Sequence, residues 1–137
     1  MNKLYLAGAM IVDPENRLLV VRKRKSSYYM LPGGKIEKGE LSSQALVREL
    51  KEELNLTVVL KELEYLGFHE TEAVNESDTI VRGEIFRLEL KENLNLIPQA
   101  EIEEAIWLTV TNYKEYKLAH LLEEFTVPIW LAGTFEY

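Results

Sequence analysis

Residues 33–56 read GGKIEKGELSSQALVRELKEELNL, a pair of glycines and a short loop leading into an acidic helix. The run from Gln44 to Leu54 lacks glycine, proline, threonine and isoleucine and is rich in helix-forming residues. At about 100° per residue, the carboxylates of Glu49, Glu52 and Glu53 share an arc of about 100° on the helix surface. The apolar side chains form a separate stripe, which faces the core and is made up of Leu46, Val47, Leu50 and Leu54.

The sequence also predicts where this helix begins and ends. Ser42 or Ser43 is a suitable N-cap, because a serine hydroxyl can accept a hydrogen bond from a free N–H of the first turn. Asn55 follows the last apolar residue and tolerates the left-handed conformation that ends many helices. We therefore expect a helix that begins near Ser42 and stops at Asn55.

The three glutamates repel one another, so their placement on one face needs a cause. Glu49 forms like-charge pairs with Glu52 and Glu53, and each pair costs a few tenths of a kcal/mol on an isolated helix. Arg48, four residues before Glu52, is the evident partner within the helix. One interpretation is a solvated acidic face. The other is a site for a hard divalent cation, which prefers oxygen ligands and would replace repulsion with coordination.

The whole chain has the size and composition of one globular domain, which we assign to residues 1–137. It has 137 residues, 47% of them hydrophobic and 28% charged. The net charge of −7 argues against a partner that is a nucleic acid polymer. There is no cysteine, which excludes disulfides and thiolate metal sites and is compatible with a reducing, cytoplasmic compartment. His69 and His120 are the only histidines, and a surface position is the simpler interpretation of each.

The N-terminal apolar run, LYLAGAMIV, predicts a first strand rather than a signal peptide. It stops at Asp13 and leads directly into a turn and a second strand. No apolar run reaches the length of about 18–20 residues that a membrane span requires, so we expect no membrane association.

The remaining elements are predicted from short alternating or apolar runs. Strands are expected at residues 3–12, 17–23, 28–31, 56–60, 64–69, 79–90 and 105–108. Residues 70–78 have the polar composition of an exposed loop, and residues 91–100 form a connection. A second helix is expected over residues 113–124, with Pro128 breaking the tail. The aromatic residues of that tail, Trp130 and Phe135, suit core or dimer contacts. This order of elements predicts an α/β domain with a mixed sheet between helices.

A basic cluster, Arg22 to Lys25, ends the second strand just before the glycines. It is either a solvated strand end or a contact for phosphate groups. Pro32 fixes its own backbone angle, whereas Gly33 and Gly34 permit geometries closed to other residues. Such a loop can bring carbonyl oxygens near a metal ion.

The spacing of the acidic stretch resembles the Nudix box, Gly-x5-Glu-x7-Arg-Glu-U-x-Glu-Glu-x-Gly-U, where U is a bulky aliphatic residue. From Gly34 to Leu56, eight of its nine defined positions match, and Asn55 replaces the usual glycine. Asparagine can adopt the same left-handed conformation, so this departure is small. The resemblance implies the Nudix fold, an α/β/α sandwich, and hydrolysis of a nucleoside diphosphate linked to another group.

The resemblance also implies a role for each matching residue. Glu52 and Glu53 would be the main ligands of Mg²⁺ or Mn²⁺, and Glu49 would bind metal or take a proton from the attacking water. Arg48 would orient the glutamates and act with Glu49 and Glu53 in catalysis. Glu40 would support the metal site, and Gly33 would offer its carbonyl oxygen. Either Glu49 or Glu53 could be the general base. A further acid is expected shortly before the last strand, where the candidates are Glu101, Glu103 and Glu104.

The substrate is predicted less directly. The short chain resembles the MutT-like branch of the family, so we expect a nucleoside triphosphate, including oxidised purine forms, to be cleaved to a monophosphate and pyrophosphate. The alternatives are a hydrolase of ADP-ribose or a dinucleoside polyphosphate, and a non-catalytic Nudix domain that binds nucleotides. The residues proposed to contact substrate are Arg22, Arg24, Tyr28, Tyr29 and Lys35. The family resemblance also makes a homodimer plausible.

Overall fold

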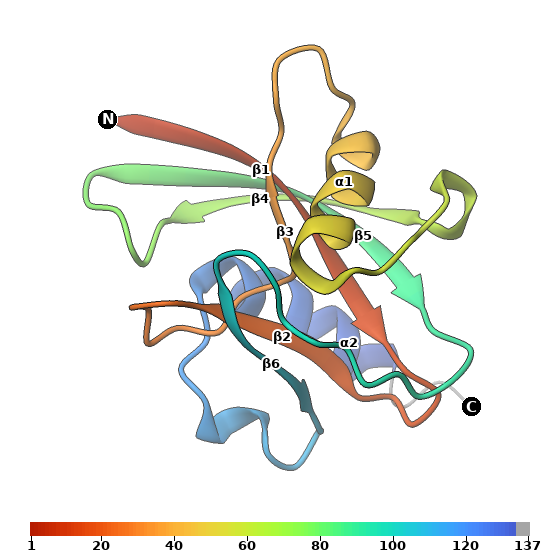
Figure 1. The fold of residues 1–137 in the computed structure, drawn as a ribbon. Coiled ribbons are helices and arrows are strands. Elements are labelled where there is room, and N and C mark those ends of the chain that lie inside the picture. The colour runs from red at the N-terminus through yellow and green to blue at the C-terminus, as the bar shows by residue number, and fades with distance from the viewer. Residues whose placement is uncertain (134–137) are drawn as a thin grey trace.

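A computed structural model describes residues 1–133 as a mixed sheet with helices on both faces (Figure 1). The strands are β1 (Asn2–Val12), β2 (Leu18–Lys23), β3 (Gly33–Lys35), β4 (Glu64–Glu72), β5 (Thr79–Glu89) and β6 (Ile102–Leu108). The helices are α1 (Ser42–Leu54) and α2 (Val127–Gly133), with a π-type segment, Leu122–Thr126, directly before α2. Two short 3₁₀ turns, Leu60–Glu62 and Tyr113–Glu115, complete the elements. Phe135, expected in the core or a dimer contact, lies outside the described residues.

The sheet has the strand order β4-β5-β1-β2-β6, with β3 pairing to β1 off this path. β1 and β5 run parallel over their whole length, and the other pairs are antiparallel. Parallel pairing of β1 and β5 requires a crossover, and the segment that contains α1 makes it. The predicted mixed sheet is confirmed.

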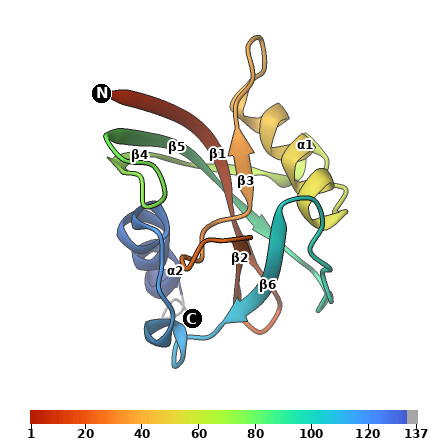
Figure 2. The ribbon, with the colours of Figure 1, turned by 60° about the vertical axis from the view of Figure 1, so that its left-hand side comes forward.

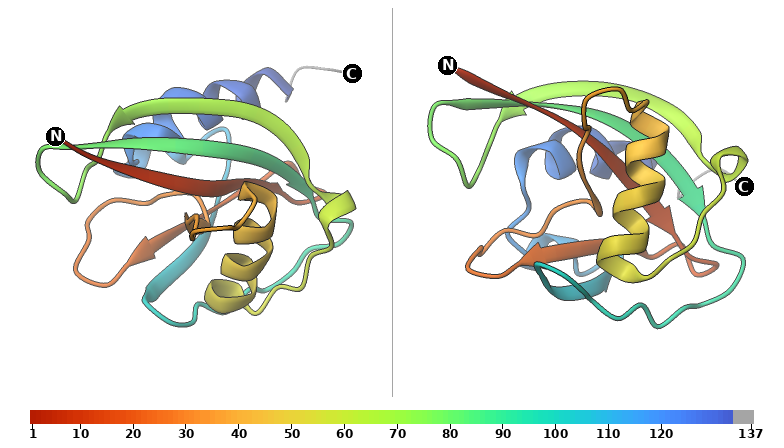
Figure 3. Two further views of the ribbon diagram at one scale, coloured as in Figure 1. Left: turned by 90° about the horizontal axis from the view of Figure 1, so that it is seen from above. Right: turned by 45° about the horizontal axis from the view of Figure 1, so that its top comes forward.

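Alternation along β1 and β2 sends side chains to two separate cores. Ala9, Ile11 and Leu19 pack against the apolar stripe of α1. Met10 and Leu18 point the other way and pack with Trp130 of α2. Figures 2 and 3 show the resulting three layers, with α1 on one side of the sheet and the C-terminal helix on the other. The predicted α/β/α sandwich is therefore confirmed.

Three predicted elements are wrong. Residues 56–60 form no strand, because Leu56 and Val58 pack onto the α1 core without a ladder partner. Residues 28–31 make only isolated bridges, at Tyr29 and Met30, and the strand that follows is the glycine segment β3. Residues 70–72 belong to β4, so the exposed loop is shorter than predicted.

The second helix lies further along the chain than predicted. Residues 113–115 form only a 3₁₀ turn, and continuous helix runs from residue 120 to residue 133. Residues 117–119 are extended because their backbone bonds to Tyr29 on both sides. Pro128 does not break the helix. The Val127 N–H bonds to the Leu122 carbonyl, a wider turn that resets the hydrogen-bond register just before the proline. In the described part of the chain, no helix combines the length and apolarity needed to cross a bilayer.

Candidate active site

The helix α1 presents the acidic residues as its sequence predicts. It begins at Ser42, but the predicted serine N-cap is wrong: the N-cap is Leu41, and no side chain caps the first turn. The Leu41 N–H instead donates to Gln44 Oε1 at 2.9 Å. It ends at Asn55, which has the left-handed angle φ 52° and whose N–H reaches carbonyls of the last turn. The apolar stripe packs on the sheet, which turns the glutamate face towards β3 and the loop that precedes β6.

Glu53 is the most buried carboxyl group of the site, with a residue exposure of 1%. Its Oε1 accepts a hydrogen bond of 3.0 Å from the Gly33 N–H. Burial raises the pKa of Glu53 to about 8, the Gly33 hydrogen bond opposes this rise, and the charges of Glu49 and Glu101 add to it. A carboxyl group this buried, with one hydrogen-bond donor, is ionised at neutral pH only if a cation approaches it.

Gly33 and Gly34 allow β3 to lie this close to its neighbours. Gly33 has φ 144°, and a Cβ there would overlap the Ala7 carbonyl oxygen of β1. A Cβ at Gly34 would overlap the carboxyl group of Glu49. Gly33 is therefore required by the backbone of β1, whereas Gly34 leaves room for the carboxyl group of Glu49.

Arg48 joins the helix to the loop before it. Its Nε and Nη2 donate to the two oxygens of Glu40 at 2.8 and 2.9 Å, a bidentate pair. These bonds, followed by the Glu37 N–H, lower the pKa of Glu40 to about 2. Arg48 also donates to Glu49 Oε1 at 3.1 Å, whereas its distance to Glu52 is 3.5 Å. Arg48 therefore orients Glu40 and Glu49 more closely than Glu52, the partner expected from spacing.

Glu49 and Glu52 differ in environment. Glu49 is half-buried, and burial, together with the neighbouring charge of Glu52, raises the pKa of Glu49. Glu52 is exposed and free to turn towards a ligand. On the predicted acidic face, solvent exposure thus increases from Glu53, which is buried, through Glu49 to Glu52, which is exposed.

The three late acids separate into two groups. The charge of Glu101 raises the pKa values of both Glu49 and Glu53. Gln99, two residues earlier, donates its N–H to the Glu53 carbonyl at 2.8 Å, so the segment that carries Glu101 lies beside α1. Glu104 instead accepts hydrogen bonds from Tyr29 (2.7 Å) and Arg22 (2.8 Å), which lower the pKa of Glu104. Glu103 lies 3.7 Å from Arg22. Arg22 of β2 therefore engages Glu103 and Glu104, which leaves Glu101 as the remaining candidate for the site.

The residues predicted to contact substrate are mostly engaged with protein. Arg24 donates to the Ala100 carbonyl, and Tyr29 is held by Glu104. Tyr28 carries the ammonium group of Lys117 over its ring at 4.7 Å. Lys35 lies at a pocket edge. Lys23, a member of the predicted basic cluster, lines the same pocket, and its positive charge opposes the rise in the pKa of Glu53.

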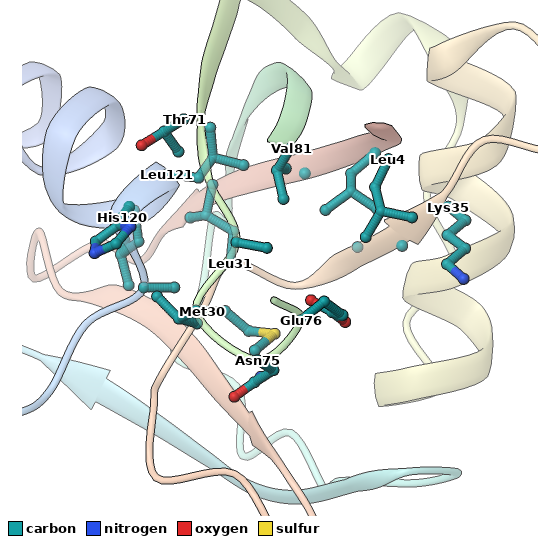
Figure 4. Close-up of a pocket in the computed structure, with 18 of the residues that line it drawn as sticks. Leu4, Met30, Leu31, Lys35, Thr71, Asn75, Glu76, Val81, His120 and Leu121 are labelled. Atoms are coloured by element: carbon teal, nitrogen blue, oxygen red, sulfur yellow. The ribbon is translucent and has the colours of Figure 1, made fainter. Parts of the chain in front are cut away.

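A pocket opens beside these residues on the α2 side of the sheet (Figure 4). Its walls are mainly apolar and include Leu4, Met30, Leu31, Val81 and Leu121. Its polar edge is formed by Lys23, Lys35, Asn75, Glu76 and His120. His120 Nδ1 bonds to the Glu72 carbonyl at 2.9 Å and therefore carries the proton. Sequence reasoning missed this pocket because its lining comes from six separate segments, residues 4–8, 23, 30–35, 71–76, 81 and 119–122, which only the fold brings together.

The acidic side chains suit a hard cation, although they are not drawn together around one. Within residues 1–133, no three His, Asp or Glu side chains converge closely enough to enclose a metal ion. The donor set nevertheless fits a hard divalent cation, since it consists of carboxylate oxygens from Glu49, Glu52 and Glu53 on one helix face, with Glu101 on the neighbouring segment. The buried, singly bonded carboxyl group of Glu53 is the group that a cation would satisfy.

The NUDIX domain family model matches residues 4–127. The chain belongs to the Nudix family. Over 61 residues it is 39% identical to the 8-oxo-dGTP diphosphatase of Escherichia coli (strain K12), which covers 42% of this chain and 47% of that protein. Over 68 residues it is 37% identical to the ADP-ribose pyrophosphatase of Methanocaldococcus jannaschii, covering 44% and 40%. This Nudix chain thus spans about half the length of the curated relatives it matches.

Solved structures support the Nudix fold over nearly the whole chain. The MutT protein of Methanosarcina mazei Go1 superposes with a TM-score of 0.79 at 18% identity, covering 98% of this chain and 97% of that one. The E. coli ORF135 protein gives a TM-score of 0.68 at 27% identity, covering 93% and 91%.

Proposed function

We propose that the protein hydrolyses a pyrophosphate bond in a nucleoside diphosphate or triphosphate derivative, with Mg²⁺ or Mn²⁺ as cofactor. One observation carries this proposal: the buried carboxyl group of Glu53 lies against Gly33 at the edge of an apolar pocket. The pocket can hold a flat ring, and the acidic face can hold the cation that a pyrophosphate group needs. We assign residues 1–137 to one Nudix domain.

The bound divalent cation would neutralise phosphate oxygens and lower the pKa of a coordinated water. Glu49, Glu52, Glu53 and Glu101 would hold the cation, with Glu40 supporting Arg48 and the Gly33 carbonyl as a further oxygen. Glu49 or Glu53 takes the proton of the attacking water while the new P–O bond forms. The bridging P–O bond breaks, and its electrons leave with the departing phosphate group. Lys23 and Lys35 stand where they can contact phosphate oxygens.

A nucleoside triphosphate is the proposed substrate, with a monophosphate and pyrophosphate as products. The matched region of the E. coli 8-oxo-dGTP diphosphatase supports this choice. ADP-ribose is the second candidate, supported by the similar match to the M. jannaschii ADP-ribose pyrophosphatase. A non-catalytic nucleotide-binding domain is a poorer fit, because a binder has no need of Glu49, Glu52 and Glu53 together.

The test is a nucleotide panel, with and without Mg²⁺, in which products are identified by ion-exchange chromatography. Panel members are the common and oxidised nucleoside triphosphates, ADP-ribose and a dinucleoside polyphosphate. We expect triphosphates to yield monophosphate and pyrophosphate. Turnover of ADP-ribose alone would select the second candidate, and nucleotide binding without any turnover would contradict catalysis.

The same assay with Glu53→Gln tests the assignment of the buried acid. Loss of a positioned acid–base group or ligand lowers turnover about 10²–10⁴-fold. Glu92→Gln, an exposed loop glutamate, removes the same charge and is expected to leave turnover unchanged. Full activity in Glu53→Gln would remove Glu53 from the catalytic machinery.

A further inference from the structure

The segment of residues 100–104 carries Glu101 and is tied to β2 at its loop end by Arg24. The Arg24 N–H donates to the Glu101 carbonyl at 3.1 Å, and the Arg24 guanidinium donates to the Ala100 carbonyl. Ala100 has φ 55°, a left-handed conformation that costs about 1–2 kcal/mol for a residue with a Cβ. A contact outside the loop must therefore hold Ala100, and Arg24 supplies it.

The strand end of the segment is tied to β2 by Arg22. Arg22 Nε donates to Glu104 at 2.8 Å, and Arg22 Nη1 donates to the Ser26 carbonyl at 2.9 Å. The Tyr29 hydroxyl donates to the same Glu104 oxygen at 2.7 Å. The pairing of β2 and β6 is irregular here, since Arg22 pairs with Glu104 and Lys23 with Ile102. Such a bulge turns the direction of the side chains that follow it.

Glu101 lies between these two attachments and directly follows the loop that contacts α1. The neighbouring Gln99 N–H donates to the Glu53 carbonyl at 2.8 Å, which seats the loop on the last turn of α1. Glu101 therefore lies between the β-bulge and the loop that contacts α1.

We propose that Arg22 and Arg24 are positioning residues, which hold both ends of segment 100–104 so that Glu101 is presented to the glutamates of α1. This inference rests on the proposed function, because Glu101 contributes there only as part of a cation site. It gives the basic cluster a role other than contact with phosphate, for the guanidinium groups of both residues are already bonded to protein oxygens.

The two roles predict opposite signs for cation affinity. Removing a positive charge near a cation site strengthens cation binding, if charge is all that changes. Removing a positioning contact misplaces Glu101 and weakens cation binding, as changes in outer-shell partners do. Binding of Mn²⁺ in the absence of nucleotide therefore distinguishes a positioning residue from a phosphate contact.

The experiment is a titration of the full chain with Mn²⁺, followed by electron paramagnetic resonance of the free ion. We expect Arg24→Ala to raise the Kd of Mn²⁺ about fivefold, the equivalent of one net hydrogen bond. Lys25→Ala is the matched control, because Lys25 is exposed, belongs to the same cluster and makes no ion pair within residues 1–133. Lys25→Ala should leave the Kd unchanged or slightly lower.

A double-mutant cycle shows whether Arg24 acts through Glu101. Glu101→Gln should weaken Mn²⁺ binding by itself, and Arg24→Ala should add nothing to the Glu101→Gln variant. Tyr29→Phe is the companion at the strand end, since it removes only the hydroxyl group that bonds Glu104, and it should weaken Mn²⁺ binding in the same direction. Thermal denaturation of each variant confirms that it is folded.

Equal Kd values for Arg24→Ala and Lys25→Ala, or additive effects of Arg24→Ala and Glu101→Gln, would overturn the positioning role and leave the proposed function standing. Failure of the unsubstituted protein to bind Mn²⁺ or to turn over any nucleotide would overturn the proposed function, and the positioning role with it.

Discussion

Glu40 and Glu53 belong to the same motif and stand on either side of Arg48, yet their carboxyl groups ionise in opposite directions. Glu40 is paired with the Arg48 guanidinium through both oxygens, and its pKa falls to about 2. Glu53 is buried behind β3 and accepts one hydrogen bond, from the Gly33 N–H, and burial raises its pKa to about 8. The same side chain thus serves as a permanent anion in one place and as a titratable group in the other.

The difference in pKa indicates different roles for the two carboxyl groups. A carboxylate already neutralised by arginine has little to offer a metal ion, so Glu40 fixes the position of Arg48. A buried carboxyl group without a cation is held in an unfavourable state, so Glu53 gains most when a cation arrives. The two glutamates therefore differ as potential metal ligands because of their surroundings, although their side chains are identical.

The largest expected effect concerns Glu53 and the stability of the metal-free protein. Because the folded-state pKa of about 8 exceeds the ordinary value of 4.5, the folded state binds the proton more tightly. The stabilisation that comes from this tighter proton binding by Glu53 is fully present below about pH 4.5 and is lost as the pH rises through about 8. Relative to Glu53→Gln, which cannot titrate, the unsubstituted protein should lose on the order of 4 kcal/mol of unfolding free energy over this window.

Urea denaturation in a chelating buffer, at about pH 5 and about pH 8.5, measures this loss. Glu52→Gln is the control, because Glu52 is exposed and the stability of that variant should follow the unsubstituted protein. Parallel pH profiles for Glu53→Gln and the unsubstituted protein would contradict the assigned cost of burial.

The next effect is on turnover and compares Gly34, in β3, with Gly39, in the loop that follows β3. An alanine at Gly34 displaces the flexible carboxyl group of Glu49 without any backbone strain, so stability should change little. Turnover should fall about 100-fold, the effect of a misplacement of about 1 Å. An alanine at Gly39 meets no neighbouring atom but is strained by φ 84°, so it should lower stability by about 1–2 kcal/mol and keep turnover.

Steady-state kinetics and urea denaturation of both variants test this crossed pattern. If Gly34→Ala retained full turnover, the position of Glu49 would not matter for catalysis. A large loss of turnover in Gly39→Ala would show that the whole loop, rather than the contact at Gly34, is sensitive.

The sequence predicts the extent of α1 because two determinants are local, the apolar stripe and the left-handed end at Asn55, whereas the expected serine cap is replaced by Leu41. It does not predict the start of the C-terminal helix, because residues 117–119 are drawn into extended pairing with Tyr29, a partner far away in the chain. The same limit applies to the late acids. Glu101, Glu103 and Glu104 look alike in sequence, and only the structure shows that Arg22 engages Glu103 and Glu104. Nor does spacing show that Arg48 bonds Glu40 more closely than Glu52.

The smallest expected effect concerns Glu40, the other side of the comparison. Arg48, followed by the Glu37 N–H, lowers the pKa of Glu40 from 4.5 to about 2. A depressed folded-state pKa stabilises the protein above the unfolded value, and this contribution is lost as pH falls from 4.5 towards about 2. Glu40→Gln should therefore lower the Tm modestly near neutral pH, and the difference from the unsubstituted protein should shrink as pH falls.

Thermal denaturation at about pH 6 and about pH 2.5 measures the difference in Tm. Glu37→Gln is the matched control: Glu37 is exposed and lies 3.8 Å from Arg48, so its loss should matter less at both pH values. Because Arg48 keeps its bond to Glu49 when Glu40 is changed, turnover of Glu40→Gln should fall only severalfold, well short of the loss in Glu53→Gln. A Tm difference that stays constant down to about pH 2.5 would mean that Glu40 stabilises the loop by shape rather than by charge, and the contrast with Glu53 would then rest on burial alone.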